Sequence, residues 1–214
     1  THFWGLYPGH HLQHSTGKGE LIMNQPVVGF AICGSFCTYD AVFRALEDVK
    51  KHFENIVPIM SPYSASTDTR FGKAKDFTAR VKELCGREII TTIEGAEPIG
   101  PKKLLDLLVI APCTGNTLAK LAQGITDTPV AMAYKAHLRN SRPVLIAVSS
   151  NDALSANAHN LGVLLDRKNN YFVPFRQDDP VHKPCSLVAD FSLLPEAMEA
   201  ALRGEQLQPL LRLA

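Results

Sequence analysis

Two patterns of apolar and polar positions alternate along the chain from Val27 onward. Short apolar runs, typical of strands buried on both faces, occur at residues 27–33, 55–60, 105–111, 143–149 and, more weakly, 171–173. Amphipathic stretches between them predict helices over 39–53, 73–85, 117–123, 152–166 and 195–203. The alternation predicts an α/β fold with a single doubly wound, Rossmann-like (flavodoxin-like) parallel sheet and helices on both of its faces.

The first 24 residues lack this periodicity. They hold four of the eight histidines and the only Trp, and they predict a flexible leader or a remnant of an expression vector. His10 and His14 have a spacing that can chelate a metal, but no third ligand accompanies them, so no metal site is predicted. Residues 25–214 are expected to form one α/β domain.

Composition narrows the classes of partner. The 22 Lys and Arg residues nearly balance the 21 Asp and Glu residues, giving a net charge of +1 without the basic patch that nucleic acid or an anionic membrane requires. No apolar stretch approaches the ~20 residues that span a bilayer. Five cysteines without a CxxC pair predict neither a disulfide framework nor a zinc site, and a cytoplasmic location is expected. Small molecules and other subunits remain as partners.

In such sheets, ligands bind at the loops that lead from the carboxyl end of a strand into the next helix. These loops are therefore the candidate site. Gly34 and Ser35 after the first strand suit one phosphate, with an ordinary Gly-Ser turn as the alternative. The loop 111–117 combines hydroxyl, amide and glycine before a helix. The hydroxyl-rich loop 61–71 ends near Arg70 and either orders over an anion or stays solvated, and 149–152 is equally explained as a helix cap.

The Gly34-Ser35 pair and the segment APCTGNTLAKLAQGITD at 111–127 resemble the flavoprotein family that includes phosphopantothenoylcysteine decarboxylase and the lantibiotic cysteine decarboxylases. The resemblance implies a Rossmann-like, flavoprotein-like domain that binds FMN, usually between the subunits of a trimer, with self-association through residues 114–127. The implied cofactor-binding residues are Gly34, Ser35, Ser61, Ala111, Thr114, Asn116 and Thr117.

Two departures from the family pattern bear on the reaction. Residues 130–133 read VAMA where the decarboxylases carry a PxMN motif, and Arg70-Phe71 stands where they have His-Phe. Both differences argue against decarboxylation of a cysteinyl substrate.

Four further segments, STDTRFG at 66–72, SSNDALS at 149–155, PFRQDDP at 174–180 and LQPLL at 207–211, resemble a narrower family, the dipicolinate synthase B subunits of spore-forming bacteria. This resemblance implies a partner chain, the dipicolinate synthase A subunit, that binds NADP or NAD. Together the two chains would oxidise a dihydrodipicolinate-level precursor to dipicolinate in the mother cell during sporulation. An FMN-dependent decarboxylase and a non-catalytic stabilising subunit are the alternatives.

A dicarboxylate substrate calls for cationic side chains, and guanidinium groups bind carboxylates best. Arg70 is the preferred catalytic candidate because it replaces the family's histidine, and His137 is a second candidate, as acid or base. Lys135, Arg139 and Arg176 are further candidates for binding a carboxylate. Surface ion pairs are the alternative role for the cations, and packing is the alternative for His137.

Overall fold

The computed structural model describes residues 25–213, in which seven strands form one sheet. The predicted leader, residues 1–24, lies outside the described residues, so the division of the chain into leader and domain stays a prediction. The strands are β1 (Val27–Ile32), β2 (Asn55–Met60), β3 (Leu107–Cys113), β4 (Val144–Ser150), β5 (Asn170–Phe172), β6 (Phe175–Arg176) and β7 (Leu187–Ala189).

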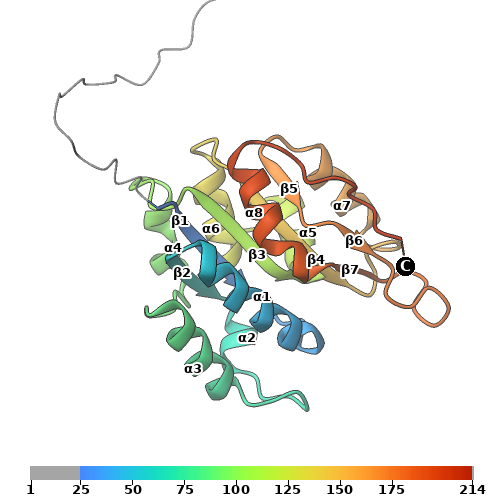
Figure 1. Cartoon of the computed structure of the whole chain (residues 1–214), viewed down its shortest axis with the longest axis horizontal. Coiled ribbons are helices and arrows are strands. Elements are labelled where there is room, and N and C mark those ends of the chain that lie inside the picture. The colour runs from blue at the N-terminus through green and yellow to red at the C-terminus, as the bar shows by residue number, and fades with distance from the viewer. Residues whose placement is uncertain (1–24, 214) are drawn as a thin grey trace, which may run out of the picture.

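The five predicted strands form a parallel sheet in the order β2-β1-β3-β4-β5, the order of flavodoxin-like folds. This confirms the predicted fold class. The sequence analysis did not predict β6 and β7, which pair antiparallel with each other. β7 also pairs antiparallel with the last two residues of β4, so this short hairpin lies beside the carboxyl end of the sheet (Figure 1).

All five predicted helices form, with shifted ends. The helices α2, α4 and α6 were not predicted. Residues 152–157, predicted as the start of a helix, form turns ahead of α7. The α-helices are α1 (Tyr39–His52), α2 (Pro62–Ser66), α3 (Ala74–Cys85), α4 (Ile93–Ala96), α5 (Gly115–Gln123), α6 (Pro129–Leu138), α7 (Ala158–Asp166) and α8 (Leu194–Leu202). The 3-10 turns are η1 (Phe36–Thr38), η2 (Glu97–Ile99) and η3 (Phe191–Leu193).

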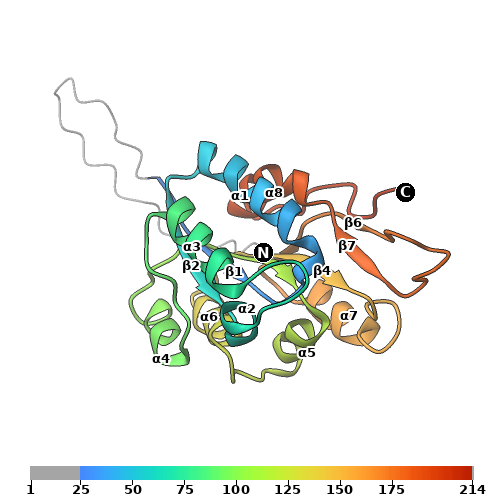
Figure 2. The same cartoon turned by 90° about the horizontal axis from the view of Figure 1, so that it is seen from below.

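Alternate residues of each central strand enter two separate hydrophobic cores, as the period of a strand requires. In β3, Leu107 and Val109 belong to the core formed with α1, α3 and α8, whereas Leu108 and Ile110 belong to the core formed with α4, α5, α6 and α7. Figure 2 shows the two helix layers on opposite faces of the sheet. Burial on both faces explains why these strands read as continuous apolar runs.

None of the helices formed by residues 25–213 combines the length and the apolar character needed to cross a membrane.

Candidate ligand-binding cleft at the carboxyl ends of the strands

A cleft of about 600 Å³ opens beyond the carboxyl ends of β1, β3 and β4. Its walls come from the loops at 34–38, 114–115 and 149–151, from residues 70–71, and from the β6–β7 hairpin, which contributes side chains between residues 178 and 188. A cleft of this size at the point where the strand order reverses, between β1 and β3, suits a small ligand.

The loop after β1 supplies Gly34 and Ser35 to the cleft. A side chain at Gly34 would place its Cβ 2.4 Å from Cδ1 of Tyr63, so only glycine fits without moving that ring. The Ser35 hydroxyl lies 2.8 Å from the Ser149 hydroxyl, which joins the loop after β1 to the end of β4. Ser35 makes no side-chain cap to the turn that follows, so its hydroxyl is left for Ser149 and for a ligand.

The loop after β3 begins α5. Thr114 caps that helix by accepting a hydrogen bond from the Thr117 amide (3.2 Å), and Thr114 also lines the cleft. The Thr117 hydroxyl is buried and donates to Cys33 Sγ (3.3 Å), while Ala111 is fully buried within β3. Asn116 is exposed on α5. The structure therefore brings Thr114 to the cleft, but the other three residues of this loop do not line it.

Ser61 also stays away from the cleft. Its side chain is almost fully buried at the end of β2, where it caps α2 by accepting a hydrogen bond from the Ser64 amide (3.2 Å). Of the residues predicted to bind the cofactor, Gly34, Ser35 and Thr114 thus meet in one place.

Arg70 lies in a tight turn that Thr69 and Gly72 close with two backbone hydrogen bonds, of 3.0 and 3.1 Å. Its guanidinium group lies over the ring of Phe71, 4.8 Å from the ring centre, and both residues line the cleft. Asp68, the acidic residue two positions before Arg70, accepts a hydrogen bond from the Ala74 amide (2.9 Å). Within the described chain no carboxylate forms an ion pair with Arg70, so no direct partner neutralises its charge.

The prediction that His137 acts as acid or base is wrong. His137 is fully buried in α6, and its Nε2 lies 2.9 Å from the carbonyl oxygen of Pro143, just before β4 and therefore far from the carboxyl ends of the strands. Burial lowers its pKa to about 4, and Nδ1 has no hydrogen-bond partner among residues 25–213. A neutral packing histidine explains both facts.

Cys33 and Cys113, which lie at the ends of β1 and β3, are also packing residues. Burial raises the pKa of the Cys33 thiol to about 11 and that of Cys113 well above its usual value. Since the thiolate is the nucleophile, neither side chain is suited to attack a substrate.

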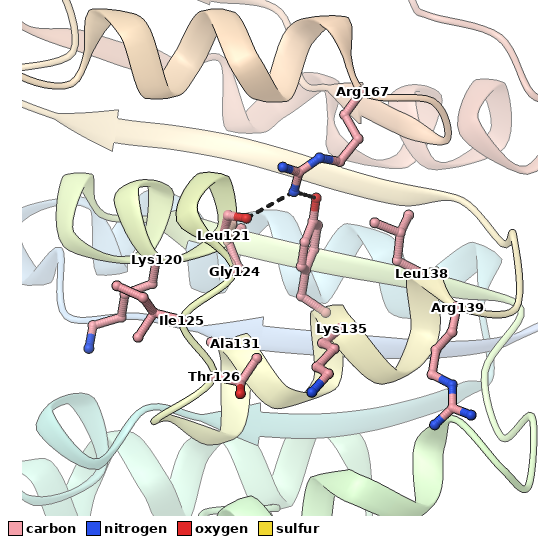
Figure 3. Close-up of a pocket in the computed structure, with 11 residues that line it drawn as sticks. Lys120, Leu121, Gly124, Ile125, Thr126, Ala131, Lys135, Leu138, Arg139 and Arg167 are labelled. Carbon is pink, nitrogen blue, oxygen red and sulfur yellow. Dashed lines mark hydrogen bonds between the residues drawn. The ribbon is translucent and has the colours of Figure 1, made fainter.

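A second cavity of about 430 Å³ lies between α5 and α6 (Figure 3). Arg167 follows α7 and reaches into it, donating to the Leu121 carbonyl oxygen (2.9 Å) and to the Tyr134 hydroxyl (3.0 Å). Lys135 and Arg139 line this second cavity, whereas Arg176 lines neither it nor the cleft. The structure thus separates these three candidates from Arg70.

Sequence reasoning missed the residues that reach the cleft from the β6–β7 hairpin, namely Asp178, Lys183 and Ser186. The sequence marks the doublet Asp178-Asp179 only as part of a turn. Its link to the cleft depends on the antiparallel pairing of β7 with β4, for which the short apolar run at 187–189 gives no usable signal.

Comparison with known proteins agrees with this architecture. The family model described as Flavoprotein matches residues 21–185. The B subunit of dipicolinate synthase from Bacillus subtilis (strain 168) is 48% identical over 184 residues, which cover 86% of this chain and 92% of that protein.

Two solved structures illustrate the range of similarity. The dipicolinate synthase B subunit from Bacillus halodurans is 44% identical, with a TM-score of 0.81 and coverage of 88% of this chain and 96% of that one. The FMN-dependent cysteine decarboxylase SpaF shares the fold at 22% identity, with a TM-score of 0.61 and coverage of 83% and 97%. The chain therefore belongs to the Flavoprotein family and, within it, to the family of dipicolinate synthase B subunits.

Proposed function

We propose that this chain works as the B subunit of a two-chain oxidoreductase that converts a dihydrodipicolinate-level precursor to dipicolinate. The A subunit would be a separate chain that binds NADP or NAD, and the reaction would take place in the cytoplasm of the mother cell of a sporulating bacterium. High identity to two proteins named as B subunits of dipicolinate synthase, over most of this chain, supports the proposal.

The observation that carries the proposal is the convergence of two kinds of group at one cleft. The Gly34-Ser35 loop offers hydroxyl and backbone groups suited to a phosphate, and Arg70 offers a free guanidinium suited to a carboxylate. A flavin site beside a carboxylate site suits the two-electron oxidation of a dicarboxylate.

FMN is the proposed cofactor, and the residues of the cleft fit it. Gly34 lets the chain pass close to Tyr63, and the hydroxyls of Ser35, Ser149 and Thr114 surround the place where a phosphate or ribityl chain would bind. The chemistry that FMN supplies when bound is two-electron transfer. To become aromatic, the dihydro precursor would lose one proton to solvent and one hydride to a two-electron acceptor, either FMN or the pyridine nucleotide of the A subunit, and Arg70 would hold its carboxylate during that step.

We further propose that the chain forms a homo-oligomer, a trimer or a multiple of it, through residues 114–127. Asn116 is exposed and does not line the cleft of its own chain, which is consistent with a residue that completes the pocket of a neighbouring copy. The second cavity borders the same segment at Lys120, Leu121 and residues 124–126.

The residues at the position of the decarboxylases' PxMN motif do not favour the alternative reaction, decarboxylation of a cysteinyl substrate. At residues 130–133, where the decarboxylases carry an asparagine, Val130, Ala131 and Ala133 are buried apolar residues of α6. They offer no group that binds a carboxylate. A purely stabilising chain would need neither a free Arg70 nor the open cleft beside it.

The test is a reconstituted enzyme with the A subunit, the pyridine nucleotide and the dihydro precursor, following dipicolinate formation. We expect turnover to fall in the order wild type, Arg70→Lys, Arg70→Ala, with losses of roughly one to two powers of ten, because a charged hydrogen-bonded contact is worth ~1.5–3 kcal/mol. Arg70→Lys keeps the charge but loses the bidentate geometry.

Three outcomes count against the proposal. Full turnover per folded Arg70→Ala molecule, judged by thermal stability of the same preparation, removes Arg70 from the site. Absence of flavin absorbance and of flavin affinity in the purified chain removes FMN. Release of CO₂ from a cysteinyl peptide without the A subunit would support the decarboxylase instead.

A further inference from the structure

The loop between β6 and β7 brings a second cation to the cleft. Lys183 lines the cleft together with Arg70, although the two residues come from segments that are far apart in the sequence. Figure 1 shows this loop, in orange, projecting beyond β6 and β7. Asp178 is the acidic residue among the side chains that line the cleft in the described chain.

Asp178 pairs with the Lys183 ammonium group. Lys183 Nζ lies 3.2 Å from Asp178 Oδ2. Burial raises the pKa of Asp178, but hydrogen bonds from Ser186 and Lys183 outweigh this and hold its pKa below the usual value. Asp178 is therefore ionised at neutral pH. It takes up one of the three donors of the ammonium group and leaves two for a ligand.

The loop is ordered by its own backbone. The Lys183 amide donates to the Asp179 carbonyl oxygen (2.8 Å), and the Ser186 amide donates to the Lys183 carbonyl oxygen (3.0 Å). The Leu154 amide donates to the Cys185 carbonyl oxygen (3.0 Å), which ties the loop to the segment after β4. These bonds place the backbone of Lys183 beside the cleft before a ligand binds.

Arg70 and Lys183 differ in what they offer. The guanidinium of Arg70 is planar and suits a bidentate carboxylate, whereas Lys183 is a point charge that tolerates several directions of approach. A ligand with one carboxylate can satisfy only one of them. A planar ring with two carboxylates offers one carboxylate for each of these two cations of the cleft.

We propose that Lys183 binds the second carboxylate of the substrate, so that Arg70 and Lys183 together select dicarboxylates over monocarboxylates. This inference rests on the proposed function, because it takes the substrate class from there. It adds a specificity residue on the β6–β7 loop, where the resemblance to the flavoprotein family implied none.

The test compares the affinities of pyridine-2,6-dicarboxylate and pyridine-2-carboxylate for the purified full-length chain by titration calorimetry. The wild type should bind the dicarboxylate more tightly. Lys183→Gln should weaken dicarboxylate binding by about ten- to a hundredfold, the scale of a charged hydrogen bond, and leave monocarboxylate binding within about twofold. Lys183→Arg should restore most of the loss.

Lys51→Gln is the matched control, since Lys51 also pairs with an aspartate, Asp48 (2.6 Å), but lies on α1 outside the cleft. It should change neither affinity. FMN affinity and melting temperature are measured on the same preparations, so that a folding defect is recognised. Lys183→Arg then keeps the test valid even if Lys183→Gln is unstable.

The outcomes separate the inference from the proposed function. If the wild type does not prefer the dicarboxylate, the cleft is not a dicarboxylate site, and both the proposed function and the role of Lys183 are overturned. If the wild type binds the dicarboxylate more tightly than the monocarboxylate and Lys183→Gln shows the same preference, only the role of Lys183 is overturned. If Lys183→Gln weakens FMN binding instead, Lys183 belongs to the cofactor phosphate, which also overturns the inference.

Discussion

Gly115, the first residue of α5, is the point at which the β3 loop approaches the segment after β4. A Cβ at this residue would lie 2.5 Å from Ser150 Oγ, 2.7 Å from Asp152 Oδ1 and 2.8 Å from Asn157 Nδ2. These polar atoms form one cluster, because the Ser150 hydroxyl donates to Asp152 and Asn157 Nδ2 donates to Asp152 Oδ2 (2.9 Å). Gly115→Ala must therefore displace a hydrogen-bonded group and not a single flexible chain end.

The expected cost follows from these contacts. Overpacking of a filled site costs about 1–3 kcal/mol, and each hydrogen bond lost from the cluster adds about 1 kcal/mol. The better helix propensity of alanine returns at most about 1 kcal/mol. We therefore expect Gly115→Ala to lower the free energy of unfolding by about 1–3 kcal/mol. Ser149 and Ser150 line the cleft, so FMN binding should weaken as well.

Gly162→Ala is the control, because no heavy atom lies within 4 Å of a Cβ at this residue of α7. It should stabilise the protein by about 0.5–1 kcal/mol. Urea unfolding followed by circular dichroism gives both values. If Gly115→Ala unfolds at or above the wild-type midpoint while Gly162→Ala behaves as expected, the close approach of the two loops is refuted.

Cofactor binding, pH dependence and assembly give three more tests. Ser35→Ala should weaken FMN binding by ~1–2 kcal/mol in a fluorescence titration, with Ser192→Ala as an exposed control, and an unchanged Kd would move the phosphate elsewhere. The folded-state pKa of His137, about 4, lies below its ordinary value of 6.5, so the unfolded chain binds more protons and stability falls as the pH drops between these values. The loss at pH 5 relative to pH 7 should be about 2 kcal/mol, and an equal loss in His137→Gln would contradict this. Sedimentation at micromolar concentration should show a trimer or a multiple of it, and a monomer would reject self-association.

The main elements of the fold could be predicted because their burial leaves a simple pattern. β1, β3 and β4 are buried on both faces and read as apolar runs, and α1 and α3 carry one apolar stripe each. α6 was missed because buried residues surround most of its circumference, so no polar face marks it as a helix. β6 and β7 have only two and three residues, too few for a period of two to be visible.

The candidate site was only partly predictable, for a related reason. The rule that ligands bind beyond the carboxyl ends of parallel strands led to Gly34, Ser35 and Thr114, all of which line the cleft. The rule does not extend to an antiparallel hairpin, so it gave no reason to consider Lys183. His137 shows the opposite error, since its chemistry is visible in the sequence and its complete burial is not.

The residues that the parallel sheet places differ from those on the other loops, and this difference bears on how one fold can serve more than one reaction. In the arrangement we propose, the cofactor is held by loops that the parallel sheet places, after β1, β3 and β4. The substrate is held by Arg70, in a turn between α2 and α3, and by Lys183, in a hairpin loop. Loops of the second kind can change without disturbing strand register or the two cores. A decarboxylase and a dicarboxylate oxidoreductase can then share one fold and one cofactor while differing at a few residues of these two segments.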